Sequence, residues 1–154
     1  MKLNTRYLFI LLVPVLFVFC SEQEDEFGKH GPVVIEFGTG CGWCAGEERI
    51  TVSSVKAEYY RNIPCGEEEG TTLKTQAMTS EEWEEIISSF DHDQFLTLDY
   101  NECNVCVDGC DEFIIITQNG SSHEIRYSPS EEIEGMDNLR QLLAHTMEKV
   151  KASR

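Results

Sequence analysis

The sequence predicts an α+β fold, in which an antiparallel sheet built from an N-terminal meander and a C-terminal hairpin carries two helices packed on one side. Three observations lead to this prediction. Several short β-rich runs precede residue 79, the dipeptide Asn119-Gly120 separates two further β-rich runs at 113–117 and 125–127, and only two segments show the 3.6-residue apolar period of a helix. Runs of strands with helices set to one side are typical of this class.

Four strands are expected before the first helix. The β-rich run Val33–Phe37 forms the first of them, and Gly38-Thr39-Gly40 should end it. The next two strands alternate apolar and polar side chains on either side of Ser53-Ser54, which predicts a tight turn between two half-buried strands. Their ranges are 50–52 and 55–59, and a fourth strand should cover 71–78.

Two segments have the pattern of amphipathic helices. Thr79 and Glu82 have the spacing of a capping box, which predicts a helix start at this point. Asp137 is expected to cap a second, terminal helix. The apolar faces are Trp83, Ile86, Ile87 and Phe90 in the first helix, and Leu139, Leu142, Leu143, Met147 and Val150 in the second.

The N-terminus has the pattern of an export signal. Lys2 and Arg6 precede an apolar run over residues 7–19 that is too short to span a bilayer, and an acidic polar stretch follows at once. We therefore expect a signal peptide at 1–19, an acidic tether at 20–31 and a single cysteine-stabilised α+β domain at 32–154. The protein should leave the cytoplasm.

Cys20 stands where the signal ends, and two kinds of processing are open there. A cysteine followed by a Ser/Glu/Asp-rich segment resembles the signal of bacterial lipoproteins of the Bacteroidetes type, which implies lipidation of Cys20 and a membrane-anchored protein in the cell envelope. The alternative is simple secretion after cleavage behind Cys20, with Val18 and Cys20 as the small residues.

The charge of the chain limits its partners. The formal net charge is −16, and removal of residues 1–19, which hold Lys2 and Arg6, leaves 10 basic and 28 acidic residues, a net charge of −18. Such a surface repels phosphate backbones and anionic lipid headgroups, so nucleic acid is not expected as a partner and the membrane only through an N-terminal lipid anchor. An unknown envelope protein or ligand, including a cation or a basic protein surface, remains open.

Six cysteines lie behind the export signal. In a small exported domain such thiols usually become a covalent framework, and six cysteines allow up to three disulfides in fifteen connectivities. The pair at the end of the first strand and the group before residue 113 are expected to meet at one edge of the sheet. The candidates for a structural disulfide or a metal are Cys41, Cys44, Cys65, Cys103, Cys106 and Cys110.

Cys41-Gly42-Trp43-Cys44 also resembles the redox motif of thioredoxin-like proteins, which implies Cys41 as attacking thiol and Cys44 as resolving thiol. That chemistry requires a helix directly after the motif, because the helix N-terminus lowers the pKa of the first thiol. The residues that follow pass into an alternating strand pattern instead. Thiol–disulfide oxidoreductase activity is therefore the alternative, and Trp43 is expected to pack over a disulfide or a metal.

The leading interpretation includes no cofactor. A structural zinc ion is the second alternative. Cys41, Cys44, Cys103 and Cys106 supply two knuckle-like pairs of thiolates, the ligand set of a closed tetrahedral structural site. A weaker hypothesis concerns calcium, for which the segment 108–112 together with Asp99 and Asn101 offers oxygen ligands. The histidines at 30, 92, 123 and 145 are expected to be solvated rather than part of a nucleophilic site.

One broader resemblance covers about residues 33–150. The segment Phe37-Gly38-Thr39-Gly40-Cys41-Gly42-x-Cys44, combined with Cys103-x-x-Cys106-x-Asp108-Gly109, resembles small uncharacterised exported bacterial lipoprotein domains. The resemblance implies the fold and linked cysteines, and no functional residue follows from it. The predicted function is a binding or accessory domain at the cell envelope rather than an enzyme, with no catalytic residue beyond the alternative pair Cys41 and Cys44.

Overall fold

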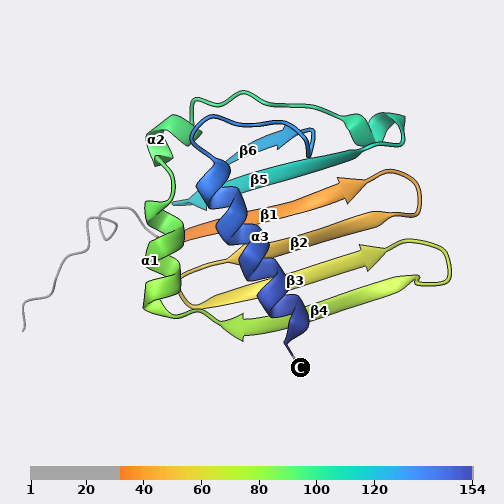
Figure 1. Ribbon diagram of the computed structural model, residues 1–154, viewed down its shortest axis with the longest axis horizontal. Coiled ribbons are helices and arrows are strands. Elements are labelled where there is room, and N and C mark those ends of the chain that lie inside the picture. The colour runs from red at the N-terminus through yellow and green to blue at the C-terminus, as the bar shows by residue number, and fades with distance from the viewer. Residues whose placement is uncertain (1–31, 154) are drawn as a thin grey trace, which may run out of the picture.

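The computed structural model describes residues 32–153 and contains one six-stranded antiparallel sheet in the order β4-β3-β2-β1-β5-β6. Helices lie on one side of it, which confirms the predicted α+β fold (Figure 1). The signal peptide and tether expected at 1–31, with Cys20, lie outside the described residues. The strands are β1 (Val33–Cys41), β2 (Gly46–Val52), β3 (Lys56–Ile63), β4 (Gly70–Ala77), β5 (Cys110–Gln118) and β6 (Ser121–Tyr127).

The central strand β1 is longer than the sequence pattern predicts. It continues through Gly38 and Gly40 to Cys41 and pairs with β2 on one side and β5 on the other. The prediction that these glycines end the strand is therefore wrong. A Cβ atom at Gly38 would lie 2.4 Å from the carbonyl oxygen of Glu48, so glycine here permits close approach of two paired strands rather than a turn.

The tight turns expected between strands are present, with one shift in position. Asn119 and Gly120 have φ angles of 54° and 79° and join β5 to β6 as a two-residue hairpin turn. The β2–β3 turn is closed by Ser53, whose hydroxyl accepts hydrogen bonds from the amides of Val55 and Lys56. Val55, which the alternation assigns to a strand, lies in that turn and is 71% exposed.

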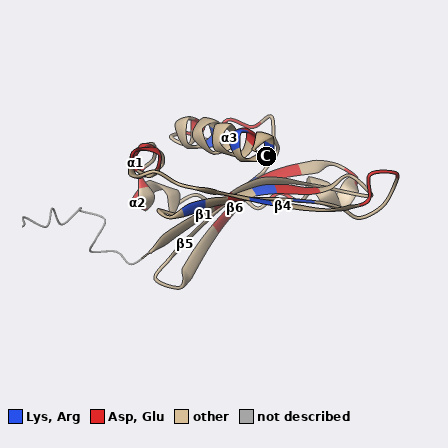
Figure 2. Cartoon of the chain, turned by 90° about the horizontal axis from the view of Figure 1, so that it is seen from below, with Lys and Arg blue, Asp and Glu red and all other residues tan. Residues whose placement is uncertain are grey.

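Three helices lie on the same side of the sheet. Helix α1 (Ser80–Ser88) begins with the predicted capping box of Thr79 and Glu82, and the one-turn helix α2 (His92–Phe95) follows it. Helix α3 (Asp137–Ala152) crosses the sheet from β6 to β4, as Figure 1 and the edge view of Figure 2 show. Asp137 does not cap α3, because it already occupies the first helical position and its carboxylate lies 3.8 Å from the guanidinium of Arg140.

The hydrophobic core lies between α3 and two transverse rows of side chains on the sheet. Leu139, Leu143 and Val150 of α3 are buried against these rows, as the apolar stripe predicts. Burial of this stripe holds the helix at one angle across the sheet. The first row is Ile125, Ile114, Phe37, Ile50 and Tyr59, and the second contains Ile116, Ile35, Val52 and Ala57.

The next row towards the right-hand end of the sheet in Figure 1 is polar. It contains Tyr127, Glu112, Thr39, Glu48 and Arg61, which are opposite one another in the strand register. This row marks the limit of the apolar core. The strands continue beyond it, so the last part of the sheet needs another source of stability.

No described helix covers the opposite face of the sheet (Figure 2). Phe113 nevertheless is only 4% exposed there, because it lies opposite Gly38 and the guanidinium of Arg126 is 5.0 Å from its ring centroid. The guanidinium of Arg49 is 4.4 Å from the ring centroid of Tyr60 in the same way. Cations stacked on aromatic rings thus shield the apolar area of this face.

Candidate functional site

All six cysteines of the described chain form disulfides at the end of the sheet beyond the polar row. Cys41–Cys110 joins the ends of β1 and β5, and Cys44–Cys65 joins the β1–β2 turn to the β3–β4 loop. The predicted disulfide framework is thereby confirmed. The third bond, Cys103–Cys106, closes a 3₁₀ turn, η2 (Asn104–Val107), that precedes β5. We call the three loops, residues 42–45, 64–69 and 103–109, the cystine tip.

The disulfides differ in what they contribute to stability. Cys41–Cys110 closes a loop of 69 residues and Cys44–Cys65 one of 21, whereas Cys103–Cys106 closes only 3. Loop-closure entropy then gives about 4, about 3 and less than about 2 kcal/mol respectively. The first two therefore stabilise the uncovered end of the sheet, and the third shapes a local turn.

The loops of the cystine tip are also in direct backbone contact. The amide of Gly42 donates to the carbonyl of Gly109 at 2.9 Å, and the amide of Gly109 donates to the carbonyl of Asn104 at 2.8 Å. A Cβ atom at Gly42 would lie 3.0 Å from the Cα atom of Asp108. The β1–β2 turn and the η2 loop thus form one rigid unit.

A buried carboxylate organises the η2 loop. Asp111 is 0% exposed and accepts hydrogen bonds from the amides of Asn104 at 2.8 Å and Val105 at 3.4 Å, at the start of the 3₁₀ turn. The calcium hypothesis joined Asp111 with Glu112, but the strand sends their side chains to opposite faces of the sheet. Within residues 32–153 no group of three or more His, Cys, Asp or Glu side chains is placed to hold a metal ion.

The alternative roles of the cysteines can be compared with this geometry. Cys41 and Cys44 are not joined to each other, and a turn and strand β2 follow them where a redox motif requires a helix. The four cysteines of the zinc hypothesis belong to three different disulfides. The structure therefore does not join Cys41 to Cys44 as a redox pair. It also does not leave the four cysteines of the zinc hypothesis as free thiolates that could bind a metal together.

The apolar side chains at the cystine tip point into solvent. Trp43 is 80% exposed and Val107 is 79% exposed, so Trp43 does not pack over a disulfide as its position between two cysteines predicts. Trp43 also has a φ angle of 53°, in the left-handed region that bulky side chains rarely occupy. A strained and exposed tryptophan on a crosslinked loop contributes little to folding, which favours a role in recognition.

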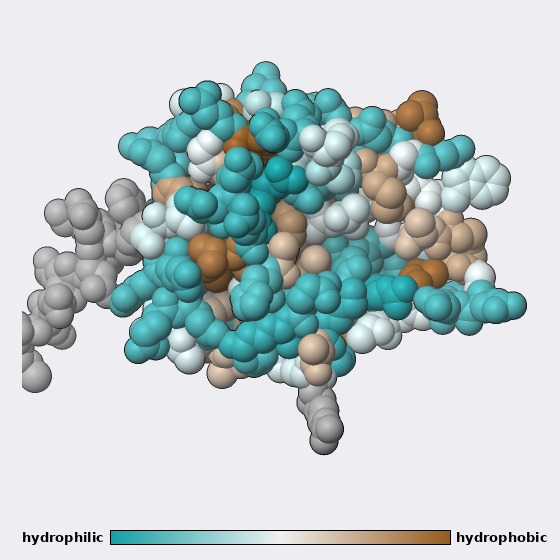
Figure 3. All heavy atoms as spheres, viewed as in Figure 1, coloured by the Kyte–Doolittle hydropathy of each residue, from teal (hydrophilic) through white to brown (hydrophobic). Residues whose placement is uncertain are grey.

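Acidic side chains lie on the loops of the cystine tip, as Trp43 and Val107 do. The loop after Cys65 carries Glu67, Glu68 and Glu69, and Asp108 follows Val107 directly. Figure 2 shows the acidic loop at the far right-hand end of the molecule, and Figure 3 shows hydrophobic spheres at that end of the helix-bearing face. Only Glu68 of these four has an ion-pair partner within the described chain, Arg61 at 3.2 Å. The tip therefore combines apolar area with negative charge.

A second polar cluster lies where α3 meets the polar row. The carboxylate of Glu112 accepts hydrogen bonds from the Tyr127 hydroxyl at 2.6 Å and from Arg140 Nε at 2.7 Å. The side chains of Arg140 and Glu112 are only 17% and 13% exposed. Burial and the hydrogen bond to Glu112 both raise the pKa of the Tyr127 hydroxyl. Arg140 also donates to the carbonyl oxygens of Pro129 and Glu131, so its guanidinium joins three segments.

A similar cluster holds the other end of α3. Glu48 accepts a hydrogen bond from the Tyr59 hydroxyl at 2.8 Å and pairs with Lys151 Nζ at 2.6 Å. Burial and the bond to Glu48 raise the pKa of Tyr59 to about 12. Burial favours a higher pKa for Glu48, but the bonds from Lys151 and Tyr59 outweigh it and the pKa is lowered. Each end of α3 is thus fastened by a tyrosine, a glutamate and a cation.

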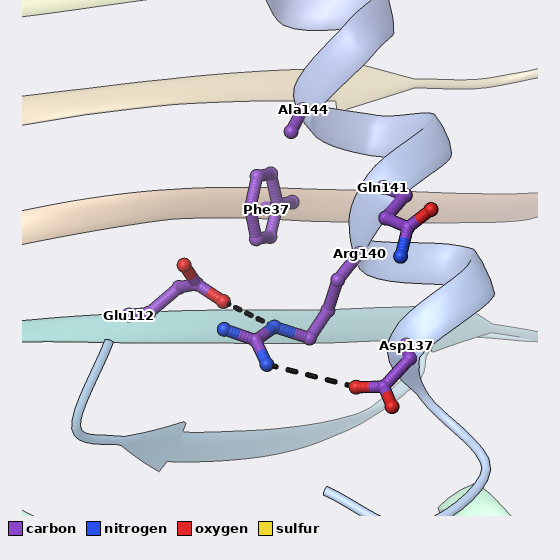
Figure 4. A pocket seen from close by; sticks show the side chains of 6 residues that line it. All are labelled: Phe37, Glu112, Asp137, Arg140, Gln141 and Ala144. Atoms are coloured by element: carbon purple, nitrogen blue, oxygen red, sulfur yellow. Dashed lines mark hydrogen bonds and ion pairs between the residues drawn. The ribbon is translucent and has the colours of Figure 1, made fainter. Parts of the chain in front are cut away.

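A cavity of about 230 Å³ adjoins the cluster of Glu112, Tyr127 and Arg140 (Figure 4). Phe37 forms an apolar wall, and Glu112 and Arg140 face each other across the ion pair drawn in the figure. Because the guanidinium of Arg140 already has a carboxylate and two carbonyl acceptors, the groups around the cavity satisfy one another. We interpret them as the attachment of α3. Sequence analysis missed this cluster, although Glu112 and Tyr127 stand on the core-facing side of alternating strands.

The histidines within the described chain lie away from the disulfides. His123 on β6 contacts the carbonyl of Leu98 at 2.9 Å, and its ring is edge-on to Phe95 at 5.2 Å. His92 belongs to the short helix α2, and its ring centroid lies 6.5 Å from that of Phe90. Helix α2 is at the left-hand end of the sheet in Figure 1, opposite the cystine tip. His145 lies on α3, and His30 is outside the described residues.

The comparisons with known proteins leave the chain without an assigned family. No protein-family model matches it, and no curated protein matches it either.

The Arg140 cluster makes a prediction about stability. Arg140→Met keeps the apolar stem but leaves Glu112 without its cation, so the free energy of unfolding should fall by about 2–3 kcal/mol. Urea denaturation measures the change. Arg61→Met is the matched control, because the side chains of Arg61 and Glu68 are 41% and 76% exposed and their ion pair should contribute less than about 1 kcal/mol. Equal losses for the two variants would contradict the assignment.

The Glu48 cluster makes a prediction about pH. Because the folded-state pKa of Glu48 lies below its ordinary value of 4.5, the unfolded chain takes up the proton first as the pH falls. The stabilisation is complete above pH 4.5 and is lost as the pH falls through the lower folded-state pKa. Denaturation curves across this acid range should show a smaller loss for Glu48→Gln than for the wild type, and an intermediate one for Tyr59→Phe. An unchanged loss in Glu48→Gln would refute this.

Proposed function

We propose that the chain is an exported domain of a bacterial cell envelope, anchored by lipid on Cys20, which binds a basic protein surface with its cystine tip. The observation that carries the binding proposal is Trp43, an apolar side chain that is 80% exposed and held in a left-handed conformation between two disulfide-bonded cysteines. A folded domain gains no stability from such a residue, so a contact with another molecule accounts for it best.

Export is supported by two independent features. Disulfides persist in oxidising compartments outside the cytoplasm, and the described chain uses all six of its cysteines in this way. The N-terminal pattern of Lys2, Arg6 and an apolar run up to Cys20 is the other feature. Among residues 32–153, no helix is long and apolar enough to cross a membrane.

The cystine tip has the properties of a preformed recognition surface. Two disulfides and the Gly42–Gly109 hydrogen bond hold its loops in place, so little conformational entropy is lost on binding. Tryptophan is the residue type most enriched at the energetic centres of protein interfaces. Trp43 is therefore the expected anchor, and Val107 extends the apolar contact.

The charge around the anchor indicates the chemistry of the partner. Glu67, Glu69 and Asp108 have no ion-pair partner within the described chain, and the mature protein has a net charge of −18. A basic surface with an apolar pocket complements this arrangement, whereas an acidic surface would be repelled. Association should accordingly weaken at high salt.

Photo-crosslinking in intact cells tests the tip directly. A photoreactive amino acid placed at position 43 or 107 of the full chain should give covalent adducts with a protein partner. The matched control is position 55, because Val55 is also an exposed apolar residue but lies at the opposite end of the sheet. Replacing Glu67, Glu68 and Glu69 with glutamine should reduce the adducts from position 43. Adducts of equal strength from position 55, or none from 43 and 107, would contradict the proposal.

A stability measurement shows whether a variant of Trp43 loses binding because it loses the contact or because it unfolds. Glycine adopts a positive φ without strain, so Trp43→Gly should leave the free energy of unfolding unchanged or raise it by up to about 1 kcal/mol while it abolishes the crosslinking contact. A large loss of stability in Trp43→Gly would show instead that the side chain serves the fold.

The lipid anchor proposed on Cys20 is tested separately, by mass spectrometry of the mature protein from a bacterial envelope. Lipidation predicts a diacyl or triacyl addition on an N-terminal Cys20 and partition into detergent. Cys20→Ser should yield an unlipidated chain. A wild-type protein that begins after Cys20 and carries no lipid would replace anchoring by simple secretion and leave the tip proposal intact.

A further inference from the structure

The two edge strands of the sheet, β6 and β4, differ in the backbone pairing on their outer sides. The edge strand β6 is covered at its C-terminal end by the segment before η2, where the carbonyl of Arg126 accepts a hydrogen bond from the amide of Glu102 and the amide of Arg126 donates one to the carbonyl of Tyr100, both at 2.9 Å. The other edge strand, β4, pairs with β3 at eight consecutive positions from Gly70 to Ala77. On its outer side, nothing within residues 32–153 pairs with it.

Strand β4 also has few of the features that normally block an open edge. It contains no proline, and its pairing with β3 runs without a bulge. Its only charged residue is Lys74, whose ammonium is held inward by the carbonyl oxygens of Lys151 at 2.5 Å and Ser153 at 2.6 Å. The remaining residues include Leu73, which is 66% exposed on the face that carries no helix, and β-branched threonines at 71, 72 and 75.

We propose that β4 accepts an added β-strand from an extended segment of a partner polypeptide. Its outward-facing amides and carbonyls would supply the main-chain hydrogen bonds, as in strand addition to other open sheets. Because side chains alternate between faces, every second residue of the segment would lie on the helix-free face, beside Thr71, Leu73 and Thr75 of β4. Apolar residues at those positions would bury the exposed Leu73.

The acidic residues near the two ends of β4 indicate the charge that the ends of the partner segment should carry. Glu67–Glu69 precede the strand, and helix α1 with Glu81, Glu84 and Glu85 follows it, whereas residues 70–77 carry only Lys74. Figure 2 shows acidic residues on both α1 and the opposite loop. The matching segment is therefore apolar and β-branched in its centre and basic at both ends.

A second copy of this chain fits the edge less well. Its own acidic loops and α1 would lie beside those of the first copy, at a net charge of −18 on each mature chain. The last turn of α3 also stands above Lys74 at the middle of β4, so antiparallel pairing of two copies would bring two helix ends together. A segment without a helix avoids both conflicts.

This inference goes beyond the proposed function and does not depend on the anchor residues Trp43 and Val107. The two surfaces share only the acidic loop Glu67–Glu69. Strand addition can therefore fail while tip binding stands, and the reverse also holds.

A synthetic peptide of alternating valine and threonine, with two lysines at each end, is the probe. Titrated into the isotope-labelled, disulfide-bonded mature chain, it should shift and protect the amides of β4 and leave those of β6 unchanged. Two further peptides carry N-methyl groups on alternate residues, one on the odd and one on the even positions. Because only one set of amides faces β4, one of these peptides should lose at least about tenfold in affinity and the other should bind like the parent.

Two variants of the protein complete the test. Leu73→Lys removes the apolar contact and adds a repelling charge, so it should weaken binding of the parent peptide by about tenfold. Leu96→Lys is the control, because Leu96 is an exposed apolar residue that follows helix α2 on the β6 side of the molecule, away from β4, and it should bind like the wild type.

Three results would overturn the proposal. Equal binding of both N-methylated peptides would show that charge alone attracts the probe. Amide shifts confined to residues outside β4 would place the peptide elsewhere. A dimer of the free chain that Leu73→Lys converts to a monomer would make a second copy the occupant of the edge. Analytical ultracentrifugation of the mature chain decides the last point.

Discussion

The attachment of α3 across the sheet is the constraint on which the rest of the structure depends. The helix buries Leu139, Leu143 and Val150 on two apolar rows, and a tyrosine–glutamate–cation cluster fastens it on either side of β1. The two cations, Arg140 and Lys151, are eleven residues apart and therefore lie about three turns apart along the helix. Apolar burial supplies most of the energy, and the paired glutamates select one angle and position for the helix.

Because α3 covers only part of the sheet, the strands need a second means of support at their far end. The polar row that contains Glu112 and Glu48 closes the apolar core, and disulfides take over beyond it. Crosslinks require no apolar area, so the loops they hold can expose Trp43 and acidic side chains without loss of the fold. The division between a helix-covered half and a crosslinked half leaves the cystine tip rigid and accessible.

Most of the fold was predictable from local patterns, and the errors have local causes. The capping box at Thr79, the Asn119-Gly120 turn and the stripe of α3 are all signals within a few residues of each other, and all are confirmed. The predicted end of β1 is wrong, because glycine occurs both in turns and at close strand contacts, and only the pairing of Gly38 with β2 distinguishes the two. Asp137 was misread as a cap, since Asp is common both there and in the first turn.

By itself, the sequence determined that this is an acidic, cysteine-rich chain with an export pattern and an α+β arrangement, because composition and periodicity are properties of neighbouring residues. Only the tertiary structure decided which of fifteen cysteine pairings forms, which glutamates meet Arg140 and Lys151, and that Trp43 faces solvent. It also decided that β6 is bridged at Arg126 and that β4 has no strand on its outer side within the described residues. These outcomes depend on strand order and register, which bring together residues far apart in the chain and leave no trace in local spacing.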